Sequence, residues 1–325
     1  MKTVDDDFAT FVQTNWSLVE TDKLIWTPHM QIICDAFQDV VEGRNNRLIV
    51  NVPHGMSKSL LAAVFLPAWI HKVAGGRVGI VCDCNELARR DWRRTQMVTR
   101  ENWPGQSVFG SLDWVSVDGA ACAIKFDMLI VDVSNAPKPS KSMIDQVIEV
   151  WMSRLHDPKN GKVILIETRS EHGDVTGRLL AKATKDEWRH ICLPMAYDAK
   201  VAKEDFRTEE GQLLCPERFS AEYIGVLHYE LPTASWEAQY QQRGGFVTVD
   251  EHDARYRNVP VEPVKGVSVT PMYPNDYAKH IADVAKRYEQ GDLSVELDVR
   301  KLLRHLEVLA VVMELEPLTQ SGGTE

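Results

Sequence analysis

Four apolar runs, separated by segments of helical periodicity, place the strongest constraint on the fold of this chain. They are RLIVNV (47–52), RVGIVCD (77–83), FDMLIVDV (126–133) and KVILIET (162–168). Continuous apolar runs of this length are typical of strands that are buried on both faces. Strands that alternate with helices form a parallel sheet with helices on both sides. The sequence therefore predicts an α/β domain with a mostly parallel central sheet.

Helical periodicity is found before and between these runs. Apolar residues recur on one face over 5–22 and over 29–42, ahead of the first strand. We expect further helices over 58–73 and 84–102, and one over 142–155 directly before the last strand. The predicted order is thus two leading helices followed by alternating strands and helices.

Composition excludes several classes of protein. The net charge of −10 excludes a uniformly basic nucleic-acid coat, although a local basic surface remains compatible with it. The six cysteines form no CxxC pair, which predicts reduced thiols rather than a disulfide scaffold or a zinc site. The acidic start, MKTVDDDFAT, is unlike a signal peptide, and no run approaches the ~18 apolar residues of a membrane span. We therefore expect a soluble, intracellular protein.

The pattern changes near residue 244, which divides the chain into three predicted parts. Residues 1–246 form the α/β domain, 247–274 a linker or arm rich in glycine and proline, and 275–325 a short helical appendage. The appendage contains two predicted helices, over 275–289 and 294–315. They are interpreted either as a hairpin packed on the domain or as a docking element for a partner.

The connection after the first strand, NVPHGMSKSLL (51–61), has the layout of a phosphate-binding loop. Pro53 and Gly55 form a short turn, and Lys58 and Ser59 begin the next helix. Backbone N–H groups and a helix N-terminus then face one point, which suits a phosphate group. In this interpretation Lys58 reaches the terminal phosphates and the Ser59 hydroxyl binds magnesium.

The formal Walker A pattern, GxxxxGK[ST], is nevertheless broken twice. Val52 and Ser57 stand where the pattern has glycine. The alternative is a plain strand-to-helix turn, capped by Ser57 and with a solvated Lys58. The third apolar run ends in Asp132, as a Walker B strand does when its carboxylate holds magnesium. The two strands in this order favour nucleotide binding.

Six stretches then carry a family resemblance. In chain order they are IWTPHMQIICDAF, RLIVNVPHGMSKSLLAAVFLPAW, RVGIVCDCNELARRDWRR, VILIETRSEHGDVTGRLL, LCPERFS and SWEAQYQQR. Together, from Trp26 to Phe246, they resemble the ATPase domain of the large terminase subunit of tailed bacteriophages. That resemblance implies a P-loop NTPase fold and a motor that hydrolyses ATP with Mg²⁺ to package DNA.

The resemblance also implies site residues and partners. The stretch at 168–178 is similar to the family's coupling motif, with Thr168, Arg169, Asp174, Gly177 and Arg178 at matching places. Implied partners are double-stranded DNA, further copies in a homo-oligomeric ring, and a portal, small terminase subunit or separate nuclease chain, in the bacterial host cytoplasm. The predicted nucleotide-binding residues are Gln31 (which would read the base), Pro53, His54, Gly55, Met56, Ser57, Lys58 and Ser59; the catalytic ones are Lys58, Glu167 and Arg169; the metal ligands are Ser59 and Asp132.

The sequence departs from the family's pattern in ways that bear on activity. The acid that usually follows the Walker B aspartate is replaced by Val133, which cannot activate water. The family's nuclease domain is not expected, because only about 80 residues follow Phe246. Glu167 ends the last predicted strand, which should neighbour the strand of Asp132. It is interpreted either as the replacement base or as a glutamate held by Arg169 or a helix N-terminus.

Two further questions stay open at this point. Arg89, Arg90, Arg93 and Arg94 lie on a predicted helix and are interpreted as an arginine finger or as a solvated or DNA-facing surface. The predicted function is an ATP-dependent DNA-packaging motor subunit of a phage or prophage. The alternative is a terminase relative that binds nucleotide or DNA without turnover, as a structural or regulatory subunit.

Overall fold

A six-stranded sheet organises the part of the chain that the computed structural model describes. The described residues are 7–105, 111–117, 124–133, 141–184 and 187–244, and they belong to the first of two compact units, Met1–Asn258. The predicted linker and the two predicted C-terminal helices lie outside the described residues.

The strands run parallel throughout this sheet, in the order β3-β2-β4-β5-β1-β6. The strand that leads into the candidate phosphate loop, β1, therefore lies between β5 and β6. The predicted fold class, an α/β protein with a parallel sheet between helices, is confirmed. The strand bounds are β1 Arg47–Asn51, β2 Val78–Cys82, β3 Leu112–Ser116, β4 Met128–Asp132, β5 Lys162–Glu167 and β6 Arg189–Cys192.

Successive strand residues point to opposite faces of the sheet, so each strand contributes to two cores. Leu48, Val50, Ile130 and Ile166 belong to one buried cluster together with the residues of the leading helices. Ile49, the next residue of β1, belongs to the other cluster. Burial on both faces explains why the four central strands are recognisable as continuous apolar runs.

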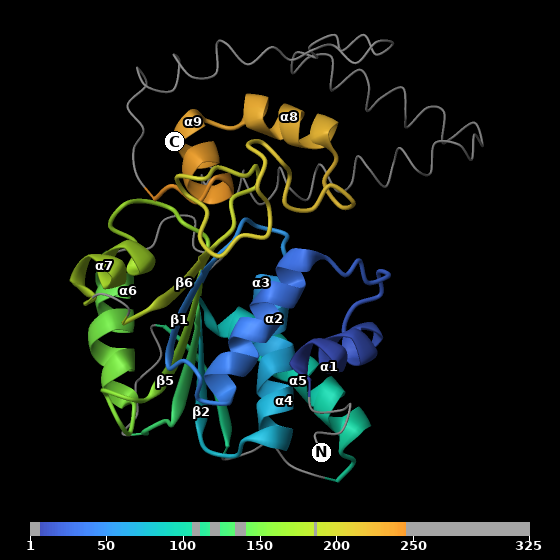
Figure 1. Cartoon of the computed structure of the whole chain (residues 1–325). Coiled ribbons are helices and arrows are strands. Elements are labelled where there is room, and N and C mark those ends of the chain that lie inside the picture. Colours follow the sequence, from blue (N-terminus) through green and yellow to red (C-terminus); the bar gives the residue numbers. More distant parts are fainter. Residues whose placement is uncertain (1–6, 106–110, 118–123, 134–140, 185–186, 245–325) are drawn as a thin grey trace, which may run out of the picture. The chain divides into compact units, whose positions relative to one another are not determined.

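Helices cover both faces, as Figure 1 shows, with α1 to α5 on one face and α6 and α7 on the other. The helix after β1 runs without a break from Lys58 to Val73 through a π-helical turn, η3. The bounds on this first face are α1 Phe8–Asn15, η2 Trp16–Leu18, α2 Pro28–Val41, α3 Lys58–Leu60, η3 Leu61–Phe65, α4 Leu66–Val73 and α5 Asn85–Asn102. Those on the second face are α6 Lys141–Asp145, η4 Gln146–Trp151, η5 Met152–Arg154 and α7 Val175–Lys182.

The chain after β6 lies at the end of the sheet where the strands finish (Figure 1). It contains α8 (Ala221–Glu230), α9 (Thr233–Ser235) and the turn η6 (Trp236–Tyr240). The buried guanidinium of Arg207 organises the preceding loop, since it donates to the carbonyl oxygens of Pro194, Met195 and Gln212 at 2.7, 3.1 and 2.7 Å. A segment held by buried hydrogen bonds is therefore present beyond this end of the sheet.

Two strands and one helix boundary differ from the sequence prediction. β3 and β6, which were not predicted, are the two edges of the sheet. They carry polar residues such as Asp113 and His190, so they lack the apolar signal of the central strands. The first predicted helix, over 5–22, is shorter: α1 ends at Asn15 and is followed only by η2.

Candidate nucleotide-binding site

The carboxyl ends of the central strands bring the predicted site residues to one edge of the sheet. Asn51 at the end of β1 pairs with Glu167 at the end of β5. Asp132 at the end of β4 pairs with Ile166 on one side and Cys82 on the other. In open parallel sheets ligands bind beyond this edge, where the loops to the helices begin. The candidate loop starts here.

The loop after β1 makes a tight turn before the helix. Gly55 has φ +77° and Ser57 has φ 58° and ψ 10°, both in the left-handed region. Met56 between them is buried, with 1% of its surface exposed. The carbonyl oxygen of Ser57 accepts the N–H of Leu61 at 3.0 Å, so the helix begins directly after this residue. Ser57 therefore occupies a backbone conformation that favours glycine, which is the residue that the Walker A pattern has at this place.

Lys58 is buried inside this turn. Its side chain is 4% exposed, and its ammonium donates to the carbonyl oxygen of Pro53 at 3.2 Å. Burial lowers the pKa of Lys58 to about 8, although the charges of Asp132 and Asp83 act in the opposite direction. The loop thus holds a cation that burial disfavours and that an anion would stabilise.

His54 lies next to this cation and is held neutral. Burial, and then the charge of Lys58, lower the pKa of His54 to about 3. A neutral imidazole adds no positive charge to the loop but has both a donor and an acceptor nitrogen. Its predicted part in nucleotide binding is therefore restricted to hydrogen bonding.

Each of the two predicted magnesium ligands is near Lys58, one in the sequence and the other in the structure. Ser59 follows it in the helix, and Asp132 is 4% exposed and close enough for its charge to raise the pKa of Lys58. A hydroxyl and a carboxylate are a suitable donor set for Mg²⁺, which binds one or two protein oxygens and keeps phosphate and water as its other ligands. Within the described ranges no group of three or more His, Cys, Asp or Glu residues could hold a metal by itself.

Gln31 lies on α2 with both ends of its amide hydrogen-bonded. Its Oε1 accepts from Trp26 Nε1 at 3.2 Å, and its Nε2 donates to Asp35 Oδ1 at 2.8 Å. The same helix meets the loop through His29: burial lowers the pKa of His29 to about 4, against the influence of the Met56 backbone. His29 of α2 therefore lies against Met56 of the loop, and Gln31 stays a predicted base-reading residue on that helix.

Glu167 is held by a helix N-terminus, which is one of the two interpretations of this residue. Its carboxylate accepts the N–H of Val175 at 3.2 Å and that of Thr176 at 2.7 Å, both in the first turn of α7. Burial, and then the charge of Asp174, raise its pKa. The expected pairing of β4 with β5 is confirmed. Because Asp132 pairs with Ile166 and not with Glu167, the two acidic side chains alternate to opposite faces of the sheet.

The stretch at 168–178 connects the loop to the end of the described chain. Thr168 Oγ1 donates to the carbonyl oxygen of Val52 at 3.3 Å. Arg169 forms a buried salt bridge with Asp174 at 2.8 Å, and its backbone N–H donates to Gln242 Oε1 at 3.2 Å. Its guanidinium also leaves no room for a side chain at Gly244. Arg169, predicted to be catalytic, thus joins α7 to residues 242–244.

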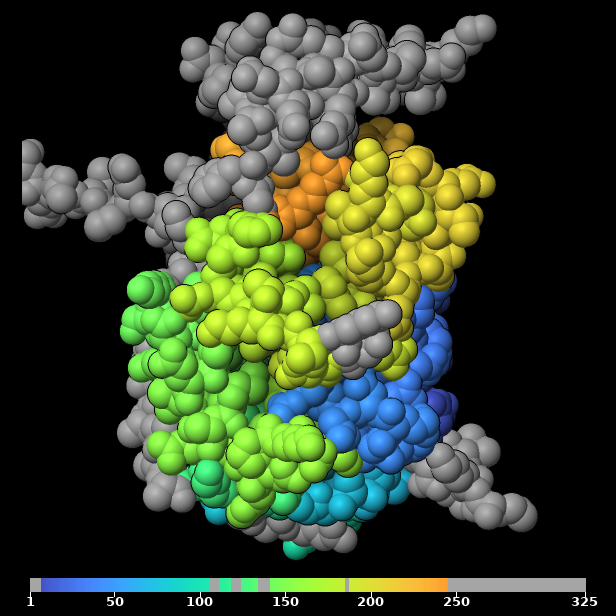
Figure 2. Space-filling model, turned by 60° about the vertical axis from the view of Figure 1, so that its left-hand side comes forward, coloured from blue at the N-terminus to red at the C-terminus, as the bar shows by residue number. Residues whose placement is uncertain are grey.

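Asp174 and Arg178, also matched to that motif, have separate structural contacts. The carboxylate of Asp174 accepts the N–H of Gly177 at 2.9 Å and caps α7. Arg178 pairs with Asp145 of α6 at 2.5 Å. Figure 2 shows the green part of the chain, which carries α7, lying against the yellow part that follows β6.

The four arginines of α5 are not equivalent. Arg90 pairs with the buried Asp91 at 2.8 Å, and Arg94 with Glu20 at 3.3 Å. Arg89 and Arg93 are exposed. Burial alone would lower the pKa of Arg90, but the hydrogen bond and charge of Asp91 and the charge of Asp132 raise it. The charge of Arg90 thus interacts with that of Asp132, a residue of the candidate site.

Sequence reasoning missed two features of the site. Asp83 directly follows β2, and its charge reaches Lys58, as that of Asp132 does. Its signal was the same as that of Asp132, an acid at the end of an apolar strand. Arg218 and Phe219 contact the loop from a distant segment: Arg218 Nη1 donates to Ser57 Oγ at 3.5 Å. The sequence offers no local signal for that contact.

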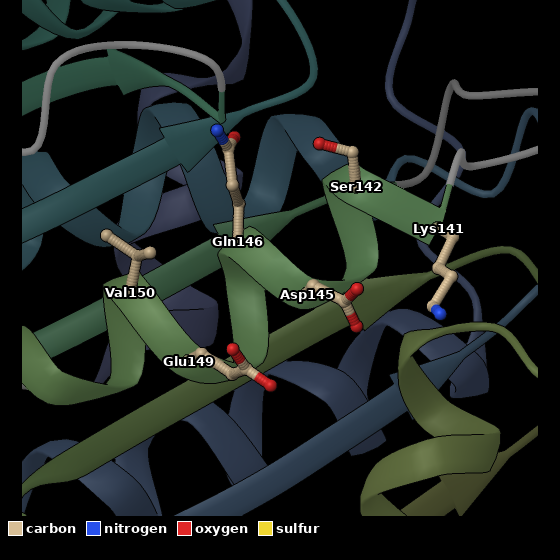
Figure 3. A pocket seen from close by; sticks show the side chains of 6 residues that line it. All are labelled: Lys141, Ser142, Asp145, Gln146, Glu149 and Val150. Atoms are coloured by element: carbon tan, nitrogen blue, oxygen red, sulfur yellow. The ribbon is translucent and has the colours of Figure 1, made fainter.

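A surface hollow of about 460 Å³ lies elsewhere, along α6 and η4 (Figure 3). Its polar lining includes the carboxylates of Asp145 and Glu149, which would repel phosphate. It also lies on the face of the sheet opposite to Lys58, since Ile144 and Val147 belong to the cluster under α7. This hollow is therefore separate from the candidate nucleotide site.

Comparisons with known proteins find similarity in structure but none in sequence. No protein-family model matches the chain, and no curated protein matches it. The structure is similar to the crystal structure of the HK97 bacteriophage large terminase, with a TM-score of 0.49 and 12% sequence identity. The similarity covers 74% of this chain and 55% of that terminase, so the chain spans about half the length of its relative.

In the part of the chain that the structure describes, no helix combines the length and the apolar character needed to cross a bilayer.

Proposed function

We propose that this chain is the ATPase part of a DNA-packaging motor of the large-terminase type, which binds ATP with Mg²⁺ and moves double-stranded DNA. The observation that carries the proposal is the buried ammonium of Lys58 inside a turn with left-handed Ser57, at the carboxyl edge of a parallel sheet. A lysine that binds phosphate is expected at this buried position, whereas a solvated lysine would be exposed.

The energetics of Lys58 support this proposal. A surface lysine at the start of a helix would extend into water, because burying an ammonium is unfavourable. Lys58 instead folds back onto the Pro53 carbonyl oxygen, and burial lowers its pKa to about 8 although the charges of Asp132 and Asp83 raise it. A bound phosphate adds negative charge next to the ammonium and stabilises it. The alternative of a plain strand-to-helix turn gives no reason for this burial.

The roles of the other residues follow from their places around the loop. Backbone N–H groups of 54–59 bind the phosphates, the Ser59 hydroxyl and the Asp132 carboxylate hold magnesium, and Lys58 neutralises charge on the outer phosphates. Magnesium, when bound, screens the phosphate charge. Thr168 joins the loop to Arg169 and so to residues 242–244. That path would carry a change at the nucleotide to the end of the domain.

DNA, the ring and the packaging partners rest on the family resemblance of the sequence. The exposed Arg89 and Arg93 of α5 offer a place for DNA phosphates that does not require sequence readout. The proposed setting is a homo-oligomeric ring that works with a portal, a small subunit or a separate nuclease.

A second candidate function is a terminase relative that binds nucleotide without turnover. Two observations favour it. Val133 follows Asp132, is 2% exposed and cannot activate water. Glu167, the proposed replacement base, is bound by two N–H groups of α7 and lies on the other face of the sheet from Asp132. In this case the chain acts as a structural or regulatory subunit.

One experiment separates the two candidates. ATP binding and hydrolysis are measured for the full chain with and without linear duplex DNA, with Lys58→Ala as the blank. Turnover that DNA stimulates and the substitution abolishes supports the motor. Binding that Lys58→Ala abolishes, without turnover in either condition, supports the second candidate. A wild-type chain that binds no ATP contradicts both.

A further inference from the structure

Residues 215–220 lie against the candidate phosphate loop although about 160 residues separate them in the sequence. Arg218 Nη1 donates to Ser57 Oγ at 3.5 Å. A Cβ at Gly55 would lie 2.9 Å from Cζ of Phe219, so the phenyl ring is packed directly on the loop backbone. Two neighbouring side chains of one distant segment therefore contact the two left-handed residues of the loop.

The backbone of this segment is firmly anchored. Leu214 and Cys215 are each 2% exposed, and the N–H of Leu214 donates to the Met195 carbonyl oxygen at 2.8 Å. The carbonyl oxygen of Cys215 accepts the N–H groups of Arg218 and Phe219 at 3.2 and 3.0 Å, which closes a turn. Ser220 follows as the N-cap of α8. The fold thus sets the position of the Arg218 backbone next to the loop.

The charge of Arg218 is available at this position. In the described part of the chain no carboxylate forms a salt bridge with it, and its guanidinium lies 5.4 Å from the centre of the Phe219 ring. Its bond to Ser57 is long and uses one of five N–H donors. By contrast, Arg90 and Arg94 of α5 are paired with Asp91 and Glu20.

We propose that Arg218 contacts the outer phosphates of the bound nucleotide, as an arginine supplied by the same chain. This inference rests on the proposed nucleotide site and adds to it a residue outside the loop. Ser57, which Arg218 contacts, directly precedes Lys58, so the guanidinium and the ammonium approach the same end of the ligand. The planar fork of a guanidinium binds two phosphate oxygens at once, which the point charge of Lys58 does not.

The proposal predicts a contact with particular phosphates. Removal of a charge-assisted hydrogen bond to a phosphate weakens binding by at least about tenfold. Arg218→Ala is therefore expected to weaken ATP binding by at least that factor and to leave AMP binding within about twofold. Arg218→Lys keeps the charge but loses the fork, and its affinity for ATP is expected to be intermediate.

The test uses titration calorimetry of the full chain with ATP, ADP and AMP in the presence of Mg²⁺. Arg100→Ala is the matched control, because Arg100 is also an exposed arginine but lies in the last turn of α5. Thermal unfolding of each variant shows whether the fold is retained, and Arg218→Gln replaces the alanine variant if that variant is unstable. The expected result is a loss for ATP and ADP in the Arg218 variants alone.

Each other outcome overturns the inference in a recognisable way. If the wild-type chain binds ATP and Arg218→Ala binds it equally well, Arg218 makes no phosphate contact and the nucleotide site stands without it. If ATP and AMP lose affinity equally, Arg218 acts on the shape of the loop. If the wild-type chain binds no nucleotide, the proposed function and this inference fail together.

Discussion

The side-chain amide of Asn51 donates a hydrogen bond to the hydroxyl oxygen of Thr176 at 3.1 Å, which joins the end of β1 to the first turn of α7. The same amide nitrogen donates to the Glu167 carbonyl oxygen at 3.0 Å, so Oδ1 accepts from His190 Nε2 at 2.8 Å. Asn51 is fully buried. One amide therefore links β1, β5, β6 and α7 at the residue before the candidate loop.

Asn51→Leu is expected to destabilise the domain strongly. It leaves the Thr176 hydroxyl, the Glu167 carbonyl and His190 Nε2 buried without this partner, and each such group costs about 1–3 kcal/mol. Urea unfolding should show a loss of about 2–5 kcal/mol, because leucine burial offsets part of the sum. Asn85→Ala, at an exposed position of α5, serves as the control and should stay within about 0.5 kcal/mol of wild type.

Ser57→Gly is expected to stabilise the protein. Ser57 has φ 58°, a conformation that costs a residue with a Cβ about 1 kcal/mol relative to glycine. The melting temperature should therefore rise, and the affinity for ATP should be retained, because the loop keeps its shape. Ser220→Gly provides the contrast: at φ −63° with a capping hydroxyl, the same change should lower the melting temperature. A fall for Ser57→Gly would mean that the Arg218 contact outweighs the backbone strain.

The parts of this fold that could be predicted are those with a local signal. Central strands buried on both faces are continuous apolar runs, and the loop after β1 was located by Gly55, Lys58 and Ser59. The edge strands β3 and β6 could not be found this way, because exposure on one side permits polar residues.

Contacts across long sequence separations had no such signal. The approach of Arg218 to Ser57 depends on the path of the chain after β6, which no periodicity reveals. The pairing of the Glu167 strand with the Asp132 strand was predicted. The face toward which the Glu167 side chain points depends on the strand register, and a shift of one residue would reverse it. That register turns its carboxylate toward α7 and away from the face of Asp132.

Glu167→Gln distinguishes the two interpretations of Glu167. If the residue holds α7, an amide nitrogen replaces one oxygen that now accepts from Val175 or Thr176, and two N–H donors then face each other. The expected result is a loss of about 1–3 kcal/mol in the free energy of unfolding at pH 7. A water-activating base would give the opposite combination: unchanged stability and ATP affinity, with turnover abolished. Chemical unfolding and an ATPase assay on the same preparation test both.

The affinity for ATP is expected to fall as pH rises above about 8. Without ligand, burial lowers the pKa of Lys58 to about 8, so at higher pH the free chain increasingly holds a neutral amine. A phosphate binds the ammonium form, and one proton must then be taken up with the nucleotide. The affinity for ATP therefore falls as pH rises. The fall approaches tenfold per pH unit once Lys58 of the ligand-free chain is mostly deprotonated.

The ligand itself does not produce this dependence. The terminal phosphate loses its last proton near pH 6, so the charge of ATP is constant above about pH 7.5. Calorimetry between pH 7 and pH 9.5 should thus show a slope that belongs to the protein. Lys58→Met should bind weakly at every pH and show no slope, whereas Lys200→Met, at an exposed position, should keep the wild-type slope. A wild-type affinity that is constant over this range would mean that Lys58 is not the phosphate ligand.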